Sequence, residues 1–191
     1  MDLVGSLRSL MLPVEFISEN LPSKGQVYEI GSGHGSLAAQ LAKLVPDRKV
    51  VALDKHLQRI EKASEIFNLS NLKFCYGDAL KFSYDKMDGI VMSDFLHHLS
   101  FELQISLIQV LSTKIKKGGV MIIKEIDKDD GVRTVLSRIW DLVLYPRDKI
   151  SYRTKGDWVE LMESFGFSVK STRQVPWFPG STFVFKCVKL N

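Results

Sequence analysis

The sequence has 191 residues, of which 45% are hydrophobic and 25% are charged. These values are typical of one globular domain that is long enough to bury a sizeable core, and they exclude a disordered or low-complexity chain. The net charge of +4 permits an anionic partner, but nucleic-acid binding is not favoured, because that function usually shows a denser basic stripe with exposed aromatic residues.

The N-terminus does not have the basic start, long apolar core and small-residue cleavage site of a signal peptide. No apolar run approaches the ~20 residues of a membrane-spanning helix. Cys75 and Cys187 fall in predicted strands and are interpreted as buried thiols in a reducing compartment. We therefore expect a cytoplasmic protein with no membrane span. Its oligomeric state does not follow from the sequence.

Apolar strands alternate with helices along most of the chain. Residues 1–25 are expected to form an N-terminal helical cap. Strands are predicted at Val27–Ile30, Lys49–Leu53, Leu72–Tyr76, Met87–Met92 and Val120–Ile126. Apolar residues at helical spacing predict a long helix from Phe101 to Lys116, which Gly118-Gly119 should end. Such alternation favours a parallel sheet that is covered by helices on both faces.

The last two predicted strands, Phe167–Gln174 and Ser181–Lys189, are separated by only six residues. So short a connection can only form an antiparallel hairpin. We therefore predict one α/β domain over residues 1–191, with a seven-stranded sheet. Five of its strands should be parallel, followed by the C-terminal antiparallel hairpin, with helices on both faces.

A glycine-rich segment, Glu-Ile-Gly-Ser-Gly-His-Gly-Ser-Leu, joins the first strand to the next helix. Glycine permits positive φ and lets a ligand lie against bare backbone. We therefore expect Gly31, Ser32, Gly33 and Gly35 to form a nucleotide-binding loop. The helix N-terminus that follows presents unpaired N–H groups, which suit an anionic group of the ligand. Alternating glycines also occur in ordinary turns, so the residues around the loop must show whether it binds a ligand.

Acidic residues stand at the ends of three successive predicted strands. Glu29 ends the first, Asp54 ends the second beside Lys55, and Gly77-Asp78-Ala79 ends the third. An acid at the tip of the second strand can accept hydrogen bonds from a ribose. Asp54 and Asp78 could instead cap helices, and Glu29 could pair with a buried lysine or arginine. Three acids in a row at one sheet edge nevertheless favour a ligand site.

The loop spacing distinguishes two classes of cofactor. Dinucleotide enzymes carry G-x-G-x-x-G, but Ser36 occupies the position of the third glycine here, and Glu29 would place a negative charge beside a pyrophosphate. From Gln26 onward the chain resembles the class I S-adenosylmethionine-dependent methyltransferases, whose first motif reads acid-apolar-Gly-x-Gly-x-Gly. The resemblance implies a Rossmann-like fold and S-adenosylmethionine as cofactor. It places Glu29 toward the methionine ammonium, Asp54 at the ribose and Asp78 at the adenine amine.

The fourth strand leads into Ser-Asp-Phe-Leu-His-His-Leu, residues 93–99. This loop does not contain the Asn-Pro-Pro-Tyr or Asp-Pro-Pro-Tyr of enzymes that methylate exocyclic amines or amides. A loop ending in His-His-Leu resembles the group that methylates small molecules. The resemblance implies that Ser93 and Asp94 line the donor side. His97 and His98 are candidate catalytic bases, although one of them could pack under the cofactor or cap the next helix.

The remaining polar residues near the strand ends carry weaker signals. Glu125 and Asp127 follow the fifth strand and are interpreted as solvated loop charges. The sequence does not contain the cysteine or histidine spacing of a zinc site. The neighbouring His97 and His98 should point in different directions, so we expect no metal.

Two segments are expected to cover the acceptor pocket. One is a helical insertion at residues 127–157, and the other is the N-terminal helix around Leu7, Leu10, Met11, Val14, Phe16 and Ile17. The insertion has more apolar residues than one helix face needs, so we expect it to pack on the sheet edge and offer a hydrophobic surface to the acceptor. Its apolar residues include Val132, Val135, Leu136, Ile139, Trp140, Leu142, Val143 and Tyr145. Tyr152, Arg153, Trp158 and Trp177 could line the pocket as well, or belong only to the core.

The sequence thus predicts a methyltransferase that acts on a small-molecule acceptor, aromatic or hydrophobic in character. Two alternatives remain open. One is a methyltransferase that acts on RNA or protein, and the other is a non-catalytic binding module with the same fold. A dehydrogenase is disfavoured by the short chain and by Ser36.

Overall fold

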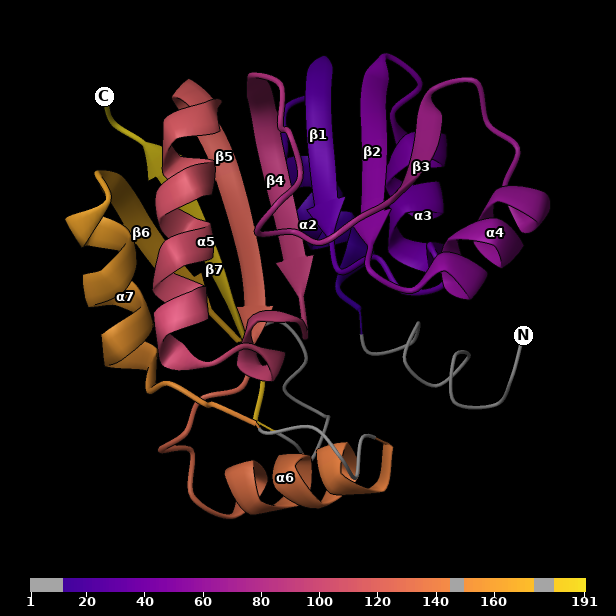
Figure 1. Ribbon diagram of the computed structural model, residues 1–191. Coiled ribbons are helices and arrows are strands. Elements are labelled where there is room, and N and C mark those ends of the chain that lie inside the picture. The colour runs from indigo at the N-terminus through magenta and orange to yellow at the C-terminus, as the bar shows by residue number, and fades with distance from the viewer. Residues whose placement is uncertain (1–11, 145–149, 174–180) are drawn as a thin grey trace.

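A computed structural model describes residues 12–144, 150–173 and 181–191 (Figure 1). The strands are β1 (Gly25–Ile30), β2 (Arg48–Asp54), β3 (Leu72–Tyr76), β4 (Met87–Ser93), β5 (Ile115–Glu125), β6 (Phe167–Thr172) and β7 (Phe183–Lys189). The helices are α2 (Val14–Asn20), α3 (Ser36–Leu44), α4 (Leu57–Ile66), α5 (Phe101–Lys114), α6 (Val132–Leu144) and α7 (Lys155–Ser164), with a 3₁₀ turn η1 (Leu96–His98).

The strands form one sheet in the order β3-β2-β1-β4-β5-β7-β6. β1 to β5 are parallel, and in the β1–β2 pair Val27 lies opposite Val50. β7 runs antiparallel to both β5 and β6. The prediction of five parallel strands and a C-terminal antiparallel hairpin is therefore confirmed.

The junction of α5 and β5 differs from the prediction. The helix ends at Lys114 and the strand begins at Ile115, so Gly118 and Gly119 lie inside β5 and do not separate the two elements. Gly118 has a φ of 74°, and the pairing with β4 shifts register in this region. Glycine accommodates such a bulge because a positive φ costs it little.

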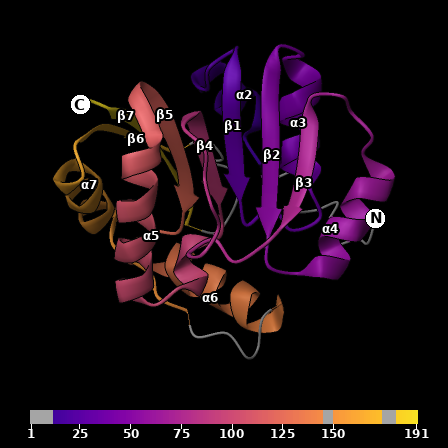
Figure 2. The ribbon, with the colours of Figure 1, turned by 45° about the horizontal axis from the view of Figure 1, so that its top comes forward.

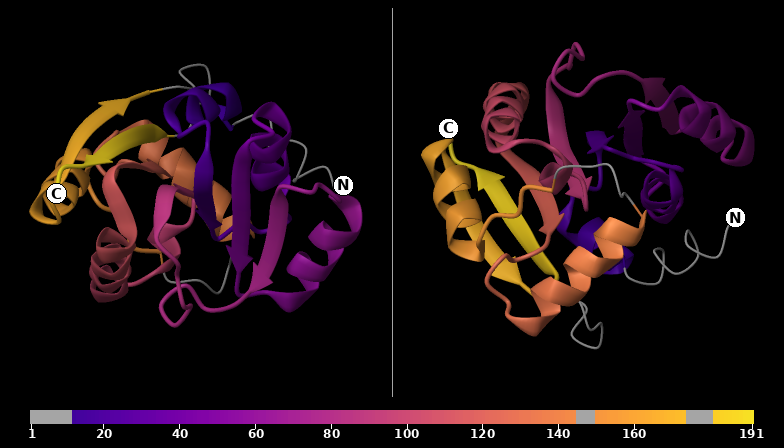
Figure 3. Two further views of the ribbon diagram at one scale, coloured as in Figure 1. Left: turned by 90° about the horizontal axis from the view of Figure 1, so that it is seen from above. Right: turned by 60° about the horizontal axis from the view of Figure 1, so that its bottom comes forward.

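Each face of the sheet has its own apolar core. One joins β-strand residues such as Ile90 and Met121 to Leu107 of α5 and to Trp158 of α7. The other joins Ile122 and its neighbours to α2 and α3. Seen from above, α5 and the α2–α3 pair lie on opposite sides of the sheet (Figure 3, left). Trp158 is 1% exposed, so it belongs to the core and not to an acceptor pocket.

Arg48, at the start of β2, ties the N-terminal helix to the sheet. Its side chain is 1% exposed. The guanidinium donates to the Pro22 carbonyl at 2.9 Å, to the Ser18 carbonyl at 2.8 Å and to the Leu41 carbonyl at 3.3 Å. A planar cation with five N–H donors suits this set of carbonyls at the ends of two helices.

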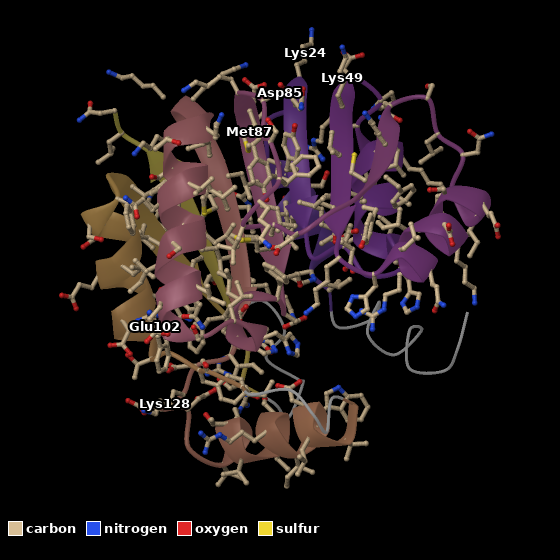
Figure 4. The ribbon with its side chains drawn as sticks, in the orientation of Figure 1. Lys24, Lys49, Asp85, Met87, Glu102 and Lys128 are labelled. Carbon is tan, nitrogen blue, oxygen red and sulfur yellow. The ribbon has the colours of Figure 1, made fainter. Side chains whose placement is uncertain are left out.

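The parallel strands all end at the same edge of the sheet. In Figure 4, Lys24 and Met87 mark the amino-terminal edge, whereas Lys128, which follows β5, lies at the opposite end beside α6. Figures 1 and 2 both place α6 beyond the carboxyl ends of β4 and β5. Ligands of open α/β sheets bind at this edge. No helix among the described residues is long and apolar enough to cross a membrane.

Candidate functional site

A cavity of about 340 Å³ opens at the carboxyl ends of the first four strands. Twelve of the predicted site residues line it: Glu29, Gly31, Ser32, Gly33, Asp54, Lys55, Gly77, Asp78, Ala79, Ser93, Asp94 and His98. Gly35 and His97 do not line it. The cavity is also lined by residues that the sequence reasoning did not single out, among them Leu12, His56, Arg59, Leu80, Phe95 and Leu99.

The glycine loop lies against the end of β2. The N–H groups of Gly31 and Ser32 both donate to the Leu53 carbonyl, at 2.8 and 3.0 Å. Gly31 and Gly33 have φ values of 76° and 55°. A Cβ at Gly31 would lie 2.3 Å from the Phe95 ring, whereas a Cβ at Gly33 would meet no atom within 4 Å. Gly31 is therefore needed for packing, and Gly33 leaves its backbone open to the cavity.

Gly35 has a different task. It precedes α3 with a left-handed backbone, φ 74° and ψ 11°, and no side chain caps this helix. A Cβ at Gly35 would lie 2.4 Å from the Phe74 ring. Gly35 thus lets the chain turn into α3 against β3, and the uncapped N-terminus suits an anionic group.

Asp54 connects the loop to the start of α4. One carboxylate oxygen accepts the Gly33 N–H at 2.8 Å, and the other accepts the His56 N–H at 2.9 Å. The residue is 7% exposed. Asp54 does not cap α4, because the N-cap position belongs to His56. The second oxygen also lies 3.1 Å from His56 Nδ1, whereas the oxygen that accepts from Gly33 keeps a further lone pair with which it could accept a hydroxyl group.

Glu29 is buried, yet its carboxylate is incompletely paired. It is 4% exposed, and its Oε2 atom has no hydrogen-bond partner among the described residues. Burial raises the pKa of the Glu29 carboxyl to about 8, although a hydrogen bond from the Ala38 backbone lowers it, while the charge of Asp54 raises it further. A buried acceptor of this kind is costly unless a ligand donates to it.

Asp78 stands at the open side of the cavity. Its Oδ1 atom accepts the Leu80 N–H at 2.9 Å, and the Phe82 N–H donates to its carbonyl at the same distance. The carboxylate is exposed. These bonds fold the Gly77-Asp78-Ala79 segment into a turn at the tip of β3.

An ion pair joins the ends of β4 and β5. Lys124 Nζ lies 2.6 Å from Asp94 Oδ2, with side-chain exposures of 5% and 29%. Asp94 is the one residue other than glycine with a positive φ, 51°, in the described part of the chain. Aspartate tolerates this left-handed conformation better than most residues. The pair fixes the backbone where β4 enters the cavity wall.

The interpretation of Glu125 as a solvated charge is wrong. Glu125 is 1% exposed, and its Oε1 atom accepts the backbone N–H of Leu96 at 2.7 Å. Its Oε2 atom lies 2.6 Å from His97 Nδ1. The sequence did contain a signal for this role: Glu125 stands at the end of a buried strand, as the acids at the ends of the first three strands do.

His97 lies behind the cavity wall, between two carboxylates. Besides Glu125, its Nε2 atom lies 3.7 Å from Asp141 Oδ2, and the Tyr152 hydroxyl donates to the same Asp141 oxygen. Burial lowers the pKa of His97, but Glu125 and then Asp141 raise it, and the net shift is upward. His97 is thus held between Glu125 and Asp141 outside the cavity, whereas His98 lines the cavity.

The rings of His97 and His98 do not diverge as the sequence suggested. Their centroids lie 4.3 Å apart at an interplanar angle of 42°. The 3₁₀ turn that contains them brings the two rings together. No group of three or more metal-ligating side chains occurs among the described residues.

The helical insertion was expected to form a wall of the acceptor pocket. None of the apolar residues of α6 lines the cavity. Val132, Ile139 and Val143 are 76%, 56% and 69% exposed, so they face solvent. Tyr152 is buried against Asp141, and Arg153 donates to Gln104 at 2.7 Å. Leu7, Leu10, Met11, Tyr145 and Trp177, also expected near the acceptor, lie outside the described residues.

Comparison with known proteins agrees with this geometry. A family model described as a methyltransferase domain matches residues 7–172. The chain belongs to the methyltransferase domain family. It is of the class I, S-adenosylmethionine-dependent type, and the methyltransferase fold explains why the strand-end acids and the glycine loop share one cavity.

Individual relatives of this methyltransferase domain are distant. Strychnine O-methyltransferase from Strychnos nux-vomica is 24% identical over 83% of the chain and 44% of its own length. An O-methyltransferase family protein from Burkholderia thailandensis superposes with a TM-score of 0.79 at 19% identity, over 97% of the chain and 57% of that structure. Human N-acetylserotonin methyltransferase, solved in complex with S-adenosylmethionine, superposes with a TM-score of 0.76 at 19% identity, over 94% of the chain and 52% of that structure. The chain spans about half the length of the curated relatives it matches.

Proposed function

We propose that this methyltransferase domain transfers the methyl group of S-adenosylmethionine to a hydroxyl oxygen of a small, hydrophobic acceptor. The observation that carries the donor half is the unpartnered Oε2 atom of Glu29, buried beside a glycine loop in a cavity that Asp54 and Asp78 also line. A ligand with an ammonium, a ribose and an amino-purine would supply a donor to each of these carboxylates.

The residues present fit this donor one by one. Glu29 would accept a hydrogen bond from the ammonium, and the uncapped start of α3 would receive the carboxylate. Asp54 would accept the ribose hydroxyls, as the acid at the tip of the second strand does in related sheets. Asp78, with Gly77 and Ala79, would face the adenine. Ser32, Lys55, Ser93 and Asp94 line the same cavity and would complete the donor side.

The donor supplies a methyl group that its sulfonium already makes electrophilic. The protein therefore has to align an acceptor lone pair with that group and exclude water, which contributes on the order of 7–11 kcal/mol by effective molarity. Phe95, Leu99 and Leu80 form an apolar part of the cavity wall. That lining favours a hydrophobic acceptor over a polar polymer.

His98 is the proposed catalytic base. It lines the cavity, whereas His97 lies outside it and has a raised pKa, so a protonated His97 would be a poor proton acceptor. His97 would instead hold His98 in position through their adjacent rings. A base of this kind is needed only when the acceptor hydroxyl is protonated at the working pH.

The strychnine O-methyltransferase relative supports an oxygen acceptor, because that protein's name states the atom that it methylates. The test is methyl transfer from isotopically labelled S-adenosylmethionine to a panel of phenols and hydroxylated heterocycles, with total RNA and a protein extract as parallel acceptors. Label in a phenol would support the proposal. Label confined to RNA or protein would overturn it, and so would donor binding without transfer to any member of the panel.

A further inference from the structure

Gln104 is a polar residue on the buried, otherwise apolar side of α5. Leu107, Ile108 and Leu111 follow it at helical spacing, and each of the four residues is 0% exposed. A buried amide costs stability unless its hydrogen-bonding groups are satisfied. Departures from the local sequence pattern are expected at functional or strained sites, so the contacts of Gln104 should indicate its role.

The amide of Gln104 bonds to both ends of the η1 turn. Its Nε2 atom donates to the carbonyls of Leu96 and Leu99, each at 3.1 Å, and to the carbonyl of Ser151 at 2.9 Å. Leu96 is the first residue of η1, and Leu99 follows its last residue. His98 lies between these two in the chain, so Gln104 restrains the backbone on either side of it.

Arg153 determines which way the Gln104 amide points. The Nε atom of Arg153 donates to Gln104 Oε1 at 2.7 Å. The guanidinium also lies over the rings of Phe101 and Trp158, with Cζ 4.9 and 5.6 Å from the two ring centroids. Because arginine can only donate hydrogen bonds, the amide oxygen must face Arg153. The NH2 group of Gln104 is therefore left to face the carbonyls of the turn.

Gln104 and Glu125 hold opposite polar groups of the same turn. The Glu125 carboxylate accepts the N–H groups of Phe95 and Leu96, whereas the Gln104 amide donates to the carbonyls of Leu96 and Leu99. The turn is thus held by β5 through its N–H groups and by α5 through its carbonyls. Both contacts are needed to fix the turn from two sides.

We propose that Gln104 is a positioning residue, which holds the η1 turn so that His98 faces the cavity. The inference rests on the proposed role of His98 as the catalytic base. Gln104 itself does not line the cavity, so it acts through the turn and does not touch the donor or the acceptor. A misplacement of about 1 Å can cost ~10²-fold in rate, so a small shift of the His98 ring should be visible in turnover.

Gln104→Met tests the proposal, because methionine fills a similar space but cannot donate to the carbonyls. With a phenol that is protonated at the assay pH, kcat should fall about 10²-fold, while the binding of S-adenosylhomocysteine stays unchanged. With a phenol that is already ionised, kcat should change little. A general loss of folded protein would instead lower both rates equally. Gln109→Met is the matched control, because Gln109 is exposed on the same helix; it should keep the wild-type kcat.

Gln104→Glu is a second variant, which carries the test if Gln104→Met does not fold. A carboxylate still accepts from Arg153 but cannot donate to the carbonyls of the turn, so kcat should fall as in Gln104→Met. The double variant Gln104→Met/His98→Gln should lose no more than His98→Gln alone. Two residues that act through one another are not additive, whereas independent effects would multiply the losses in rate.

The NMR signals of the histidine rings give a readout that does not depend on turnover. The chain has four histidines, and the signal that is missing from His98→Gln assigns His98. Gln104→Met should shift this signal and leave those of His34 and His56 in place. Gln109→Met should shift none of the four.

Three outcomes would overturn the proposal. They are a wild-type His98 signal in Gln104→Met, a wild-type kcat in both Gln104 variants with the protonated phenol, or a double variant in which the two losses multiply. The proposed function fails separately, when no phenol is methylated or when His98→Gln keeps full turnover. In either case the His98 signal still decides whether Gln104 positions the turn.

Discussion

His97 Nδ1 lies 2.6 Å from Glu125 Oε2, and each side chain is 1% exposed. The contact joins the turn after β4 to the last residue of β5. Because Glu125 also accepts the backbone N–H groups of Phe95 and Leu96, one carboxylate fixes both the path of the η1 turn and the ring of His97. The position of His98 in the cavity wall depends on this arrangement.

Replacing His97 should change the pH dependence of stability. The pKa of His97 is raised in the folded state, against burial, by Glu125, Asp141 and Asp94. Its stabilising contribution should therefore be fully present below about pH 6.5, the unfolded value, and decline as pH rises through the folded value. His97→Gln should lose about 3–5 kcal/mol at pH 6, because a buried carboxylate then has no cation, and less at pH 9. Denaturant unfolding at several pH values would measure the free energy of unfolding of both proteins. A difference between wild type and His97→Gln that stays constant with pH would contradict the prediction.

His98→Gln tests the base without disturbing the donor site. Turnover should fall by about 10²–10⁴-fold, the usual contribution of a general base, while the affinity for S-adenosylhomocysteine stays unchanged by calorimetry. The control is the acceptor itself. A phenol that is already ionised at the assay pH needs no base and should lose much less activity. An equal loss with both acceptors would show that His98 acts in some other way.

Glu29→Gln should weaken binding of S-adenosylhomocysteine, which carries the same ammonium as the donor. Free Glu29 has a pKa of about 8, and a bound ammonium would lower that pKa. The wild type should therefore release close to one proton on binding at pH 7, and fewer as pH rises above 8. Calorimetry in buffers of different ionisation enthalpy measures the release. Glu29→Gln should abolish it, whereas Glu15→Gln, on the exposed side of α2, should not. If Glu29→Gln released as many protons on binding as the wild type, Glu29 would not be the residue that binds the ammonium.

The Gly33→Ala variant, compared with Gly131→Ala, distinguishes an effect on ligand binding from an effect of backbone strain on stability. Gly33 and Gly131 have φ values of 55° and 58°, and a Cβ at either would meet no protein atom within 4 Å. Both alanine variants should lose a similar amount of stability, on the order of 1–2 kcal/mol for a left-handed residue. Only Gly33→Ala should also lose binding of S-adenosylhomocysteine, because only Gly33 lines the cavity. Equal binding by the two variants would show that the donor does not approach Gly33.

The sheet and the donor side of the site could be predicted from sequence because their signals are local. Each strand is a short apolar run, and parallel strands must place their last residues at one edge. Glu29, Asp54 and Asp78 therefore appear together once the strands are located. Gly35 does not line the cavity, and the sequence alone does not distinguish a glycine that turns the chain from a glycine that contacts a ligand.

The acceptor side could not be predicted in the same way. The sequence of the insertion has more apolar residues than one helix face needs, but that excess does not say which side of α6 turns inward. The inward face is decided by Tyr152 and Ser181, which bond to Asp141 and Ser137 from later in the chain. Glu125 was misjudged for a related reason: a carboxylate followed by charged loop residues looks solvated until its partner His97 is placed beside it.

The carbonyls that surround Arg48 bear on where this domain can be cut. A fragment beginning at β1 would retain every residue of the glycine loop, yet Ser18 and Pro22, which accept from the guanidinium, would be missing. Of the three carbonyl acceptors, the truncated protein would keep only that of Leu41, so α2 should be kept in any minimal version made for expression or crystallisation.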